Sequence, residues 1–178
     1  STNRIKGEIT PGYSILARER ITFIHRLLPA LRLVLLIRNP IERAWSQAMM
    51  NLVTLPGRSY EEVSRDEFLR HFRSPRSVLR GDYLNMIDNW LSVFDEDRLF
   101  VGLYDHIRLR PRELLGDVCK HLGVSTDVDG GRFPLHEVVH KGTGIAPPDS
   151  LRSVLQDMYR DDLRRLVARF GNRVAHWQ

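Results

Sequence analysis

The residues best suited to chemistry stand where an apolar run meets a proline. Residues 33–37 are all aliphatic, and Arg38, Asn39 and Pro40 follow directly, with Ser46 a short distance further along the chain. A planar guanidinium can hold a phosphate or sulfate group through two parallel hydrogen bonds, and a serine hydroxyl can donate to the same anion. The pattern favours an anion-binding site at Arg38 and Ser46. The alternative is that Arg38 pairs only with a carboxylate and that Ser46 lies on a helix surface.

The elements around Arg38 would position it well for this task. Residues 31–37 predict a short strand buried on both faces, which is typical of a parallel sheet. Asn39 is a favoured N-cap and Pro40 a favoured first helical residue, and the apolar residues that follow keep helical spacing. Arg38 would therefore lie at the carboxyl end of a strand and beside a helix N-terminus. Both places attract anionic ligands.

The rest of the chain alternates between strand-like and helical patterns. We expect a short strand at 4–10, a second buried strand at 98–104, loops at 74–81 and 125–148, and helices at 14–28, 59–72, 82–94, 111–122 and 150–170. Strands separated by helices indicate a three-layer α/β fold with a parallel sheet flanked by helices. The length of 178 residues suits a single domain, so we expect one domain over residues 1–178.

The composition excludes several classes of protein. Cys119 is the single cysteine, so neither an internal disulfide nor a cysteine-rich zinc site can form. We expect no metal, because the sequence shows no metal-ligand spacing. No apolar run approaches the roughly 20 residues of a membrane span, and no signal peptide is visible. A bacterial cytoplasm is the default location, although a Golgi-type enzyme without its anchor would have the same features.

The charge balance favours an anionic partner. The chain carries 27 Lys and Arg residues against 22 Asp and Glu residues, and lysine occurs only at Lys6, Lys120 and Lys141. The arginine-rich surface suits phosphate or sulfate groups, although the same arginines could form an ordinary solvated surface. A nucleic-acid-binding protein would show basic residues interleaved with aromatic residues. No such cluster stands out, so we expect no nucleic-acid partner.

Five segments, in order, resemble sulfotransferases that use 3′-phosphoadenosine 5′-phosphosulfate (PAPS), in their heparan-type and bacterial branch. The segment 38–46 (RNPIERAWS) resembles the 3′-phosphate-binding motif of that family. The other similar segments are 7–13 (GEITPGY), 80–83 (RGDY) with Trp90, Leu91 and Phe94, 98–123, and 140–142 (HKG) with 159–162 (YRDD).

The resemblance implies a P-loop-like sulfotransferase fold and a set of nucleotide-binding residues. Arg38 and Ser46 would hold the 3′-phosphate of PAPS, Tyr83 would line the site, and Lys141 and Gly142 would close over the nucleotide. The implied reaction transfers a sulfuryl group from PAPS to a hydroxyl or amine acceptor on a carbohydrate or small molecule, without a metal. The alternative is a non-catalytic nucleotide-binding or interaction module derived from a sulfotransferase.

The resemblance is weaker for the catalytic and acceptor-binding residues. Glu8 and Thr10 would face the acceptor, but Ile9 stands where many relatives have a lysine. In the family, the phosphosulfate-binding loop and the usual base lie upstream, and nothing before residue 7 can be that loop. We therefore expect a partial domain that is inactive alone, with Glu8 and His140 as candidate bases. A sheet without its first strand would expose apolar surface, so we also expect self-association.

Overall fold

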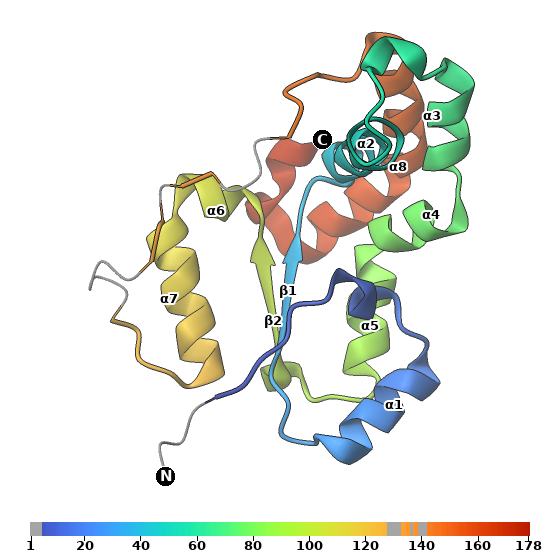
Figure 1. The fold of residues 1–178 in the computed structure, drawn as a ribbon. Helices are drawn as coiled ribbons and strands as arrows, with labels where there is room; N and C mark the ends of the chain where they lie inside the picture. The colour runs from blue at the N-terminus through green and yellow to red at the C-terminus, as the bar shows by residue number, and fades with distance from the viewer. Residues whose placement is uncertain (1–4, 128–132, 136, 139–141) are drawn as a thin grey trace. The chain divides into compact units, whose positions relative to one another are not determined.

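The computed structural model describes residues 5–127, 133–135, 137–138 and 142–178. The chain folds as two compact units, each built from two segments (Figure 1). The first unit comprises Ser1–Ile37 and Asn85–Glu137, and the second comprises Arg38–Leu84 and Val138–Gln178. The expectation of a single domain over the whole chain stays a prediction.

A parallel two-stranded sheet lies at the centre of the first unit. Strands β1 (Leu33–Ile37) and β2 (Leu99–Leu103) pair in register from Leu33 opposite Leu99 to Ile37 opposite Leu103. Both predicted strands and their parallel pairing are thus confirmed. The predicted strand at 4–10 is wrong for its described part, because residues 5–10 adopt no regular secondary structure.

Helices cover both faces of this sheet (Figure 1). On one face, α1 (Arg18–Leu27) and the first-unit part of α5 (Tyr83–Leu91) contribute to a buried cluster that packs against β1. Its members are Ile21, Trp90 and Phe94, with Leu33 among the partly buried residues around them. The arrangement confirms the α/β class and the flanked parallel sheet.

The opposite face of the sheet receives α7 (Pro111–Leu122), which follows the short helix α6 (Asp105–Leu109). Gly102 lets this helix approach, since a Cβ at that position would lie 3.1 Å from the Leu114 side chain and 2.6 Å from that of Leu36. Helix α7 ends as predicted at Gly123, whose positive φ of 71° is the left-handed conformation that glycine adopts without strain.

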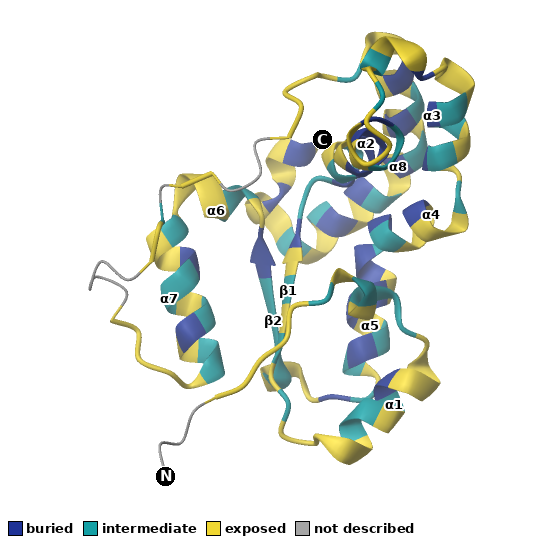
Figure 2. Ribbon diagram, in the orientation of Figure 1, coloured by how far each residue is buried: buried dark blue, intermediate teal, exposed yellow. Residues whose placement is uncertain are grey.

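The face of β1 on the α7 side is more open than predicted. Val34 and Leu36 are 42% and 39% exposed, so the expectation of a strand buried on both faces is wrong for these two residues (Figure 2). Helix α7 covers the neighbouring strand, where Leu114 meets Gly102, and leaves part of β1 accessible.

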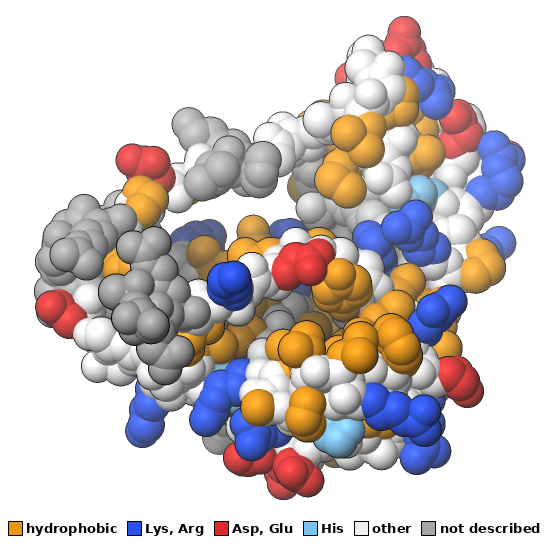
Figure 3. All heavy atoms as spheres, turned by 60° about the horizontal axis from the view of Figure 1, so that its bottom comes forward, with side chains coloured by type: hydrophobic (Ala, Val, Ile, Leu, Met, Phe, Trp, Pro, Cys, Tyr) orange, Lys and Arg blue, Asp and Glu red, His pale blue; other side chains and the backbone are white. Residues whose placement is uncertain are grey.

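Further apolar side chains of the first unit are exposed on α1 and after its end. Phe23, Leu27 and Leu28 are 55%, 62% and 55% exposed. Hydrophobic side chains gather on the face that Figure 3 brings forward. Self-association through such a surface stays a prediction.

The second unit is helical and holds its own core. Its helices are α2 (Pro40–Met49), α3 (Arg65–Phe72), α4 (Pro75–Gly81) and α8 (Asp149–Phe170), and α2 continues into a π-helical turn, Met50–Thr54. The core includes Trp45, Phe68, Phe72 and Leu155. Phe68 and Phe72 are at most 1% exposed, and burial of each side chain stabilises the unit by roughly 1.5–3 kcal/mol.

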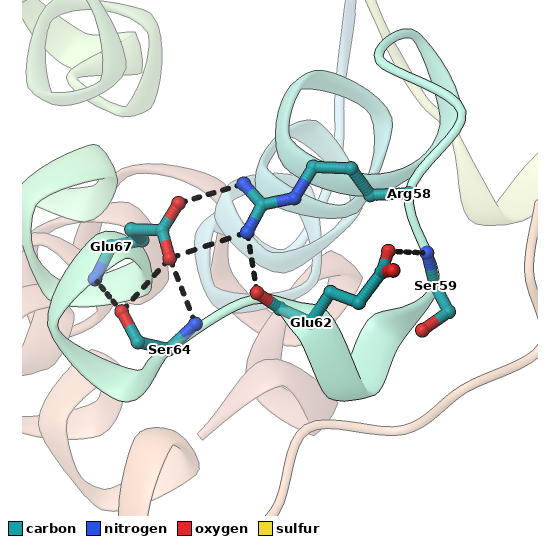
Figure 4. A network of polar contacts seen from close by, with 5 residues as sticks. All are labelled: Arg58, Ser59, Glu62, Ser64 and Glu67. Carbon is teal, nitrogen blue, oxygen red and sulfur yellow. Dashed lines mark hydrogen bonds and ion pairs between the residues drawn. The ribbon is translucent and has the colours of Figure 1, made fainter.

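The predicted helix at 59–72 is interrupted at its start by two capping boxes. Ser59 and Glu62 cap only a 3-10 turn, Tyr60–Glu62, and Ser64 with Glu67 then begins α3 (Figure 4). Arg58 joins the two boxes, because its Nη1 lies 2.7 Å from Glu67 Oε1 and its Nη2 donates to the Glu62 carbonyl. The hydrogen bond from Arg58, followed by those from Ser64, lowers the pKa of Glu67 to about 2.

The predicted loop at 74–81 is wrong, because α4 occupies most of it. The Ser74 side chain caps this helix by accepting from the Ser77 N–H at 3.4 Å, and Pro75 takes the first position. The described residues between 125 and 148 form neither helix nor strand, as expected. Among the described helices, none is both long and apolar enough to cross a membrane.

Candidate functional site

The junction between β1 and α2 has the local structure that the sequence predicts. The Asn39 side chain caps α2, with its Oδ1 accepting from the Ile41 N–H at 3.0 Å, and Pro40 occupies the first turn. The Asn39 amide also donates to the carbonyl of Trp177 at 3.2 Å, so the C-terminal segment holds the start of the helix. Pro40 has no N–H and Asn39 accepts from the N–H groups of Ile41 and Arg43, so the helix end offers an anion mainly the positive end of its dipole. The junction can therefore attract an anion.

Arg38 immediately precedes this helix and pairs with a carboxylate on it. Its Nε and Nη2 lie 3.1 Å and 3.0 Å from Oε2 of Glu42. The side chains are 29% and 56% exposed, and ion pairs in such settings contribute little net stability. A phosphate group could therefore replace the carboxylate as the partner of Arg38 at small cost.

Ser46 lies on the same face of α2 as Glu42. Positions 42 and 46 are four residues apart, which places them one above the other on a helix, and both residues are exposed. One helical turn is about 5.4 Å, so Ser46 lies roughly that far beyond Glu42 along the axis. The structure thus places the two predicted phosphate-binding residues, Arg38 and Ser46, along one accessible side of the helix.

The buried side chain of Tyr83 contacts the backbone of Arg38. It is 5% exposed, and its hydroxyl accepts from the backbone N–H of Arg38 at 3.3 Å. Burial raises the pKa of Tyr83 to about 12, so the phenol remains neutral at physiological pH. Direct contact between Tyr83 and a nucleotide stays a prediction, whereas its contact with the Arg38 backbone is part of the structure.

Arg43 faces the interior and ties three helices together. Its guanidinium donates to Gln47 Oε1 at 2.5 Å on α2, to the Ser77 carbonyl at 2.9 Å on α4, and to the Tyr159 hydroxyl at 2.9 Å on α8. These three residues are at most 9% exposed. No local sequence signal points to this role of Arg43, because its partners at positions 77 and 159 are distant in the chain.

A second distant segment is anchored to α2 through Trp45. The indole N–H of Trp45 donates to the backbone carbonyl of Ile145 at 2.7 Å. Ile145 belongs to the stretch that begins at Gly142, one of the predicted nucleotide-binding residues. The other two candidates in this region, His140 and Lys141, lie outside the described residues.

Glu8 and Thr10, the predicted acceptor-side residues, contact each other in the first unit. Oε1 of Glu8 accepts from the Thr10 hydroxyl at 2.8 Å and from the Tyr13 hydroxyl at 2.9 Å. The hydrogen bond to Glu8, and then its negative charge, raises the pKa of Tyr13. This exposed cluster holds one carboxylate oxygen between two hydroxyl groups.

Among the residues that the structure describes, no group of three or more His, Cys, Asp or Glu side chains is arranged to hold a metal ion. The candidate site is built from an arginine, a hydroxyl and the positive end of a helix dipole, all of which favour anions.

Comparison with known proteins identifies a family over most of the chain. The sequence model described as "Sulfotransferase family" matches residues 13–128. This range includes Arg38, Ser46 and Tyr83. Glu8, Thr10 and Gly142 lie outside it, so the match bears on the α2 region more than on the acceptor-side candidates.

Two curated mouse proteins and one solved structure are similar. The chain is 26% identical to bifunctional heparan sulfate N-deacetylase/N-sulfotransferase 3 and 25% identical to the same enzyme's form 1, over 85% of this chain in each case. It spans only 21% and 20% of those proteins. A crystal structure of a sulfotransferase from Alicyclobacillus acidocaldarius matches with a TM-score of 0.66 and 23% identity, covering 93% of this chain and 64% of that one. This last likeness concerns the fold.

Proposed function

The chain belongs to the sulfotransferase family, and from that premise we propose that it helps to transfer a sulfuryl group from PAPS to a hydroxyl or amine acceptor. Its proposed contribution is the site that binds the 3′-phosphate of the nucleotide. The observation that carries the proposal is the position of Arg38, at the end of β1 and directly before the N-terminus of α2.

The chemistry of this junction suits a phosphate dianion. The Arg38 guanidinium can donate two hydrogen bonds once it turns from Glu42 to the ligand. The dipole of α2 also favours an anion at this end of the helix, and Ser46 offers a hydroxyl on the same side. Few backbone N–H groups are left for the ligand, because Pro40 has none and those of Ile41 and Arg43 donate to Asn39. Tyr83 and Asn39 hold the backbone of this turn, so the donors are ordered before the ligand arrives.

Binding of the 3′-phosphate would assist the reaction by orienting the nucleotide. In sulfuryl transfer, the acceptor oxygen or nitrogen attacks sulfur, the bond from sulfur to the 5′-phosphate oxygen breaks, and a base takes the acceptor proton. A nucleotide fixed at its 3′-phosphate keeps the sulfuryl group in line with the acceptor. Lys141 and Gly142 are proposed to close over the same nucleotide.

The acceptor side of the proposal rests on Glu8 and Thr10. Glu8 carries a carboxylate that accepts from two hydroxyl groups, and such a carboxylate can bind an acceptor hydroxyl or amine, or take its proton. His140 is the other candidate base. Two similar mouse proteins are named as heparan sulfate N-sulfotransferases, which favours an amine or hydroxyl on a carbohydrate as the acceptor.

The direct test is calorimetric titration of this chain with 3′-phosphoadenosine 5′-phosphate (PAP), the product left after PAPS loses its sulfuryl group. We expect binding to the unmodified chain and loss of about tenfold or more in affinity in Arg38→Ala, since a hydrogen bond to a charged group contributes about 1.5–3 kcal/mol. Arg152→Ala is the matched control, because Arg152 is an exposed arginine on α8 of the same unit. Equal affinities in the Arg38 and Arg152 variants would contradict the proposed site.

A further inference from the structure

The indole of Trp45 joins two parts of the second unit that lie 100 residues apart in the chain. Its Nε1–H donates to the Ile145 carbonyl at 2.7 Å, a short distance for a hydrogen bond from nitrogen to oxygen. Trp45 lies on α2, one residue before Ser46. The contact therefore connects the segment around Ile145 to the helix that carries the proposed phosphate site.

The position of the Trp45 ring is tightly fixed. Trp45 is 6% exposed, stacks on Phe68 with ring centroids 5.1 Å apart and planes 24° apart, and meets the edge of Tyr60 at 6.3 Å. A buried ring held by one stacked and one edge contact cannot reorient without opening the core. The indole N–H therefore points in one direction, and it is satisfied only if the Ile145 carbonyl lies there as its acceptor.

The partner segment, which we call the 142–146 loop, has a defined shape of its own. Gly142 and Gly144 have left-handed φ values of 63° and 71°, which other residues adopt only at a cost. Between them, the Thr143 hydroxyl accepts from the Ile145 N–H at 3.4 Å. All five residues of the loop are exposed, Ile145 included at 39%, so the hydrogen bond from Trp45 to the Ile145 carbonyl bears on where the loop lies.

We propose that Trp45 is a positioning residue that fixes the 142–146 loop against α2 and thereby strengthens binding of the donor nucleotide. The inference rests on the proposed function, because it assumes that α2 and this loop both contact PAPS. A loop already held in place loses less conformational entropy when the ligand binds. Without the indole N–H, the loop would be ordered only when the nucleotide binds, and the conformational entropy lost then would weaken binding.

The test removes the donor and keeps an aromatic ring. Trp45→Phe should bind PAP about two- to tenfold more weakly than the unmodified chain, the change expected for one neutral hydrogen bond. Amide hydrogen exchange at residues 142–146 should be faster in Trp45→Phe without ligand, and PAP should slow it again. A structural defect alone would lower the fraction of protein that can bind. Calorimetry would then show a lower binding stoichiometry with an unchanged affinity.

Three further variants separate the causes. Phe72→Leu loosens the same core one helical turn beyond the Phe68 ring on which Trp45 stacks. Trp90→Phe removes an indole from the first unit. Both variants should bind PAP like the unmodified chain. Thr143→Val removes the acceptor inside the loop without touching the core, and should weaken binding in the same direction as Trp45→Phe.

The outcomes distinguish this inference from the proposed function. If the unmodified chain does not bind PAP, the proposed function fails and this inference fails with it. If the chain binds PAP in an Arg38-dependent way but Trp45→Phe binds equally well, the inference alone is overturned. Equal weakening by Phe72→Leu and Trp45→Phe would also overturn it, because general loosening of the core would then be the cause.

Discussion

The Arg38 guanidinium and the Glu42 carboxylate form an ion pair across one turn at the start of α2, with two guanidinium nitrogens within 3.1 Å of one carboxylate oxygen. The proposed phosphate partner of Arg38 must therefore compete with Glu42. Because the pair is exposed, water and salt weaken it, and a dianionic phosphate is the stronger partner. The ion pair keeps Arg38 at the helix N-terminus when no nucleotide is bound.

Replacement of Glu42 tests this competition. Glu42→Gln removes the negative charge beside the bound phosphate, so we expect PAP to bind about two- to fivefold more tightly at low ionic strength, the scale of an exposed charge interaction. The gain should shrink as salt is added, because salt screens exposed charges. Calorimetry across a salt series measures it. Weaker binding in Glu42→Gln would show that Glu42 orients Arg38 and does not compete with the ligand.

Tyr83→Phe tests the support beneath Arg38. The change removes the acceptor of the Arg38 N–H, and we expect the free energy of unfolding to fall by about 1–2 kcal/mol. It should also change how the free energy of unfolding depends on pH in the alkaline range. The pKa of Tyr83 is raised from 10.0 to about 12, so the folded chain holds this proton more tightly than the unfolded chain, and stability is lost as the pH rises through this range.

The measurement for Tyr83 is urea unfolding below pH 10.0 and between pH 10.0 and about pH 12. The unmodified chain should lose more stability across the alkaline range than Tyr83→Phe. Identical alkaline losses would mean that Tyr83 is not the group responsible.

Arg43→Met should be among the more damaging single changes in the second unit. It leaves the buried Ser77 carbonyl and Tyr159 hydroxyl without their guanidinium donor, and we expect a loss of about 2–4 kcal/mol. Chemical denaturation measures the loss, and Arg152→Met is the control on an exposed site. A loss no larger than that of the control would contradict the role of Arg43 in joining α2, α4 and α8.

Glu67 should make the second unit sensitive to acid. Its pKa falls from 4.5 to about 2 in the folded chain, mainly through the hydrogen bond from Arg58. Its contribution is therefore fully present above pH 4.5 and is lost as the pH falls toward about 2. Glu67→Gln should lower stability above pH 4.5 and reduce the acid dependence, as read by thermal unfolding. Glu61→Gln, a change at an exposed neighbour, should leave that dependence in place.

Local signals account for what the sequence predicts well. Asn39 and Pro40 mark the start of α2, the aliphatic residues 33–37 mark β1, and Gly123 marks the end of α7. Each signal acts within a few residues, so each can be recognised without the fold. The same signals placed Arg38 at the strand-to-helix junction and Ser46 on the helix that follows it.

The remaining features depend on contacts between distant residues. Arg43 meets Tyr159, and Trp45 meets Ile145, across more than half of the chain. No local pattern encodes such pairs. The same holds for Val34, which looks like a buried strand residue but is 42% exposed because α7 covers the neighbouring strand. Helix α4 could not be predicted from the sequence because it is only seven residues long and has little apolar periodicity.

Recognition of the 3′-phosphate by Arg38 can be tested directly with one thermodynamic cycle. PAP and adenosine 5′-phosphate differ only in that phosphate, so their affinities are measured for the unmodified chain and for Arg38→Ala. We expect the unmodified chain to prefer PAP by about tenfold or more and Arg38→Ala to lose most of this preference. An equal preference for PAP in both proteins would rule out this role of Arg38, because the 3′-phosphate would then be recognised elsewhere.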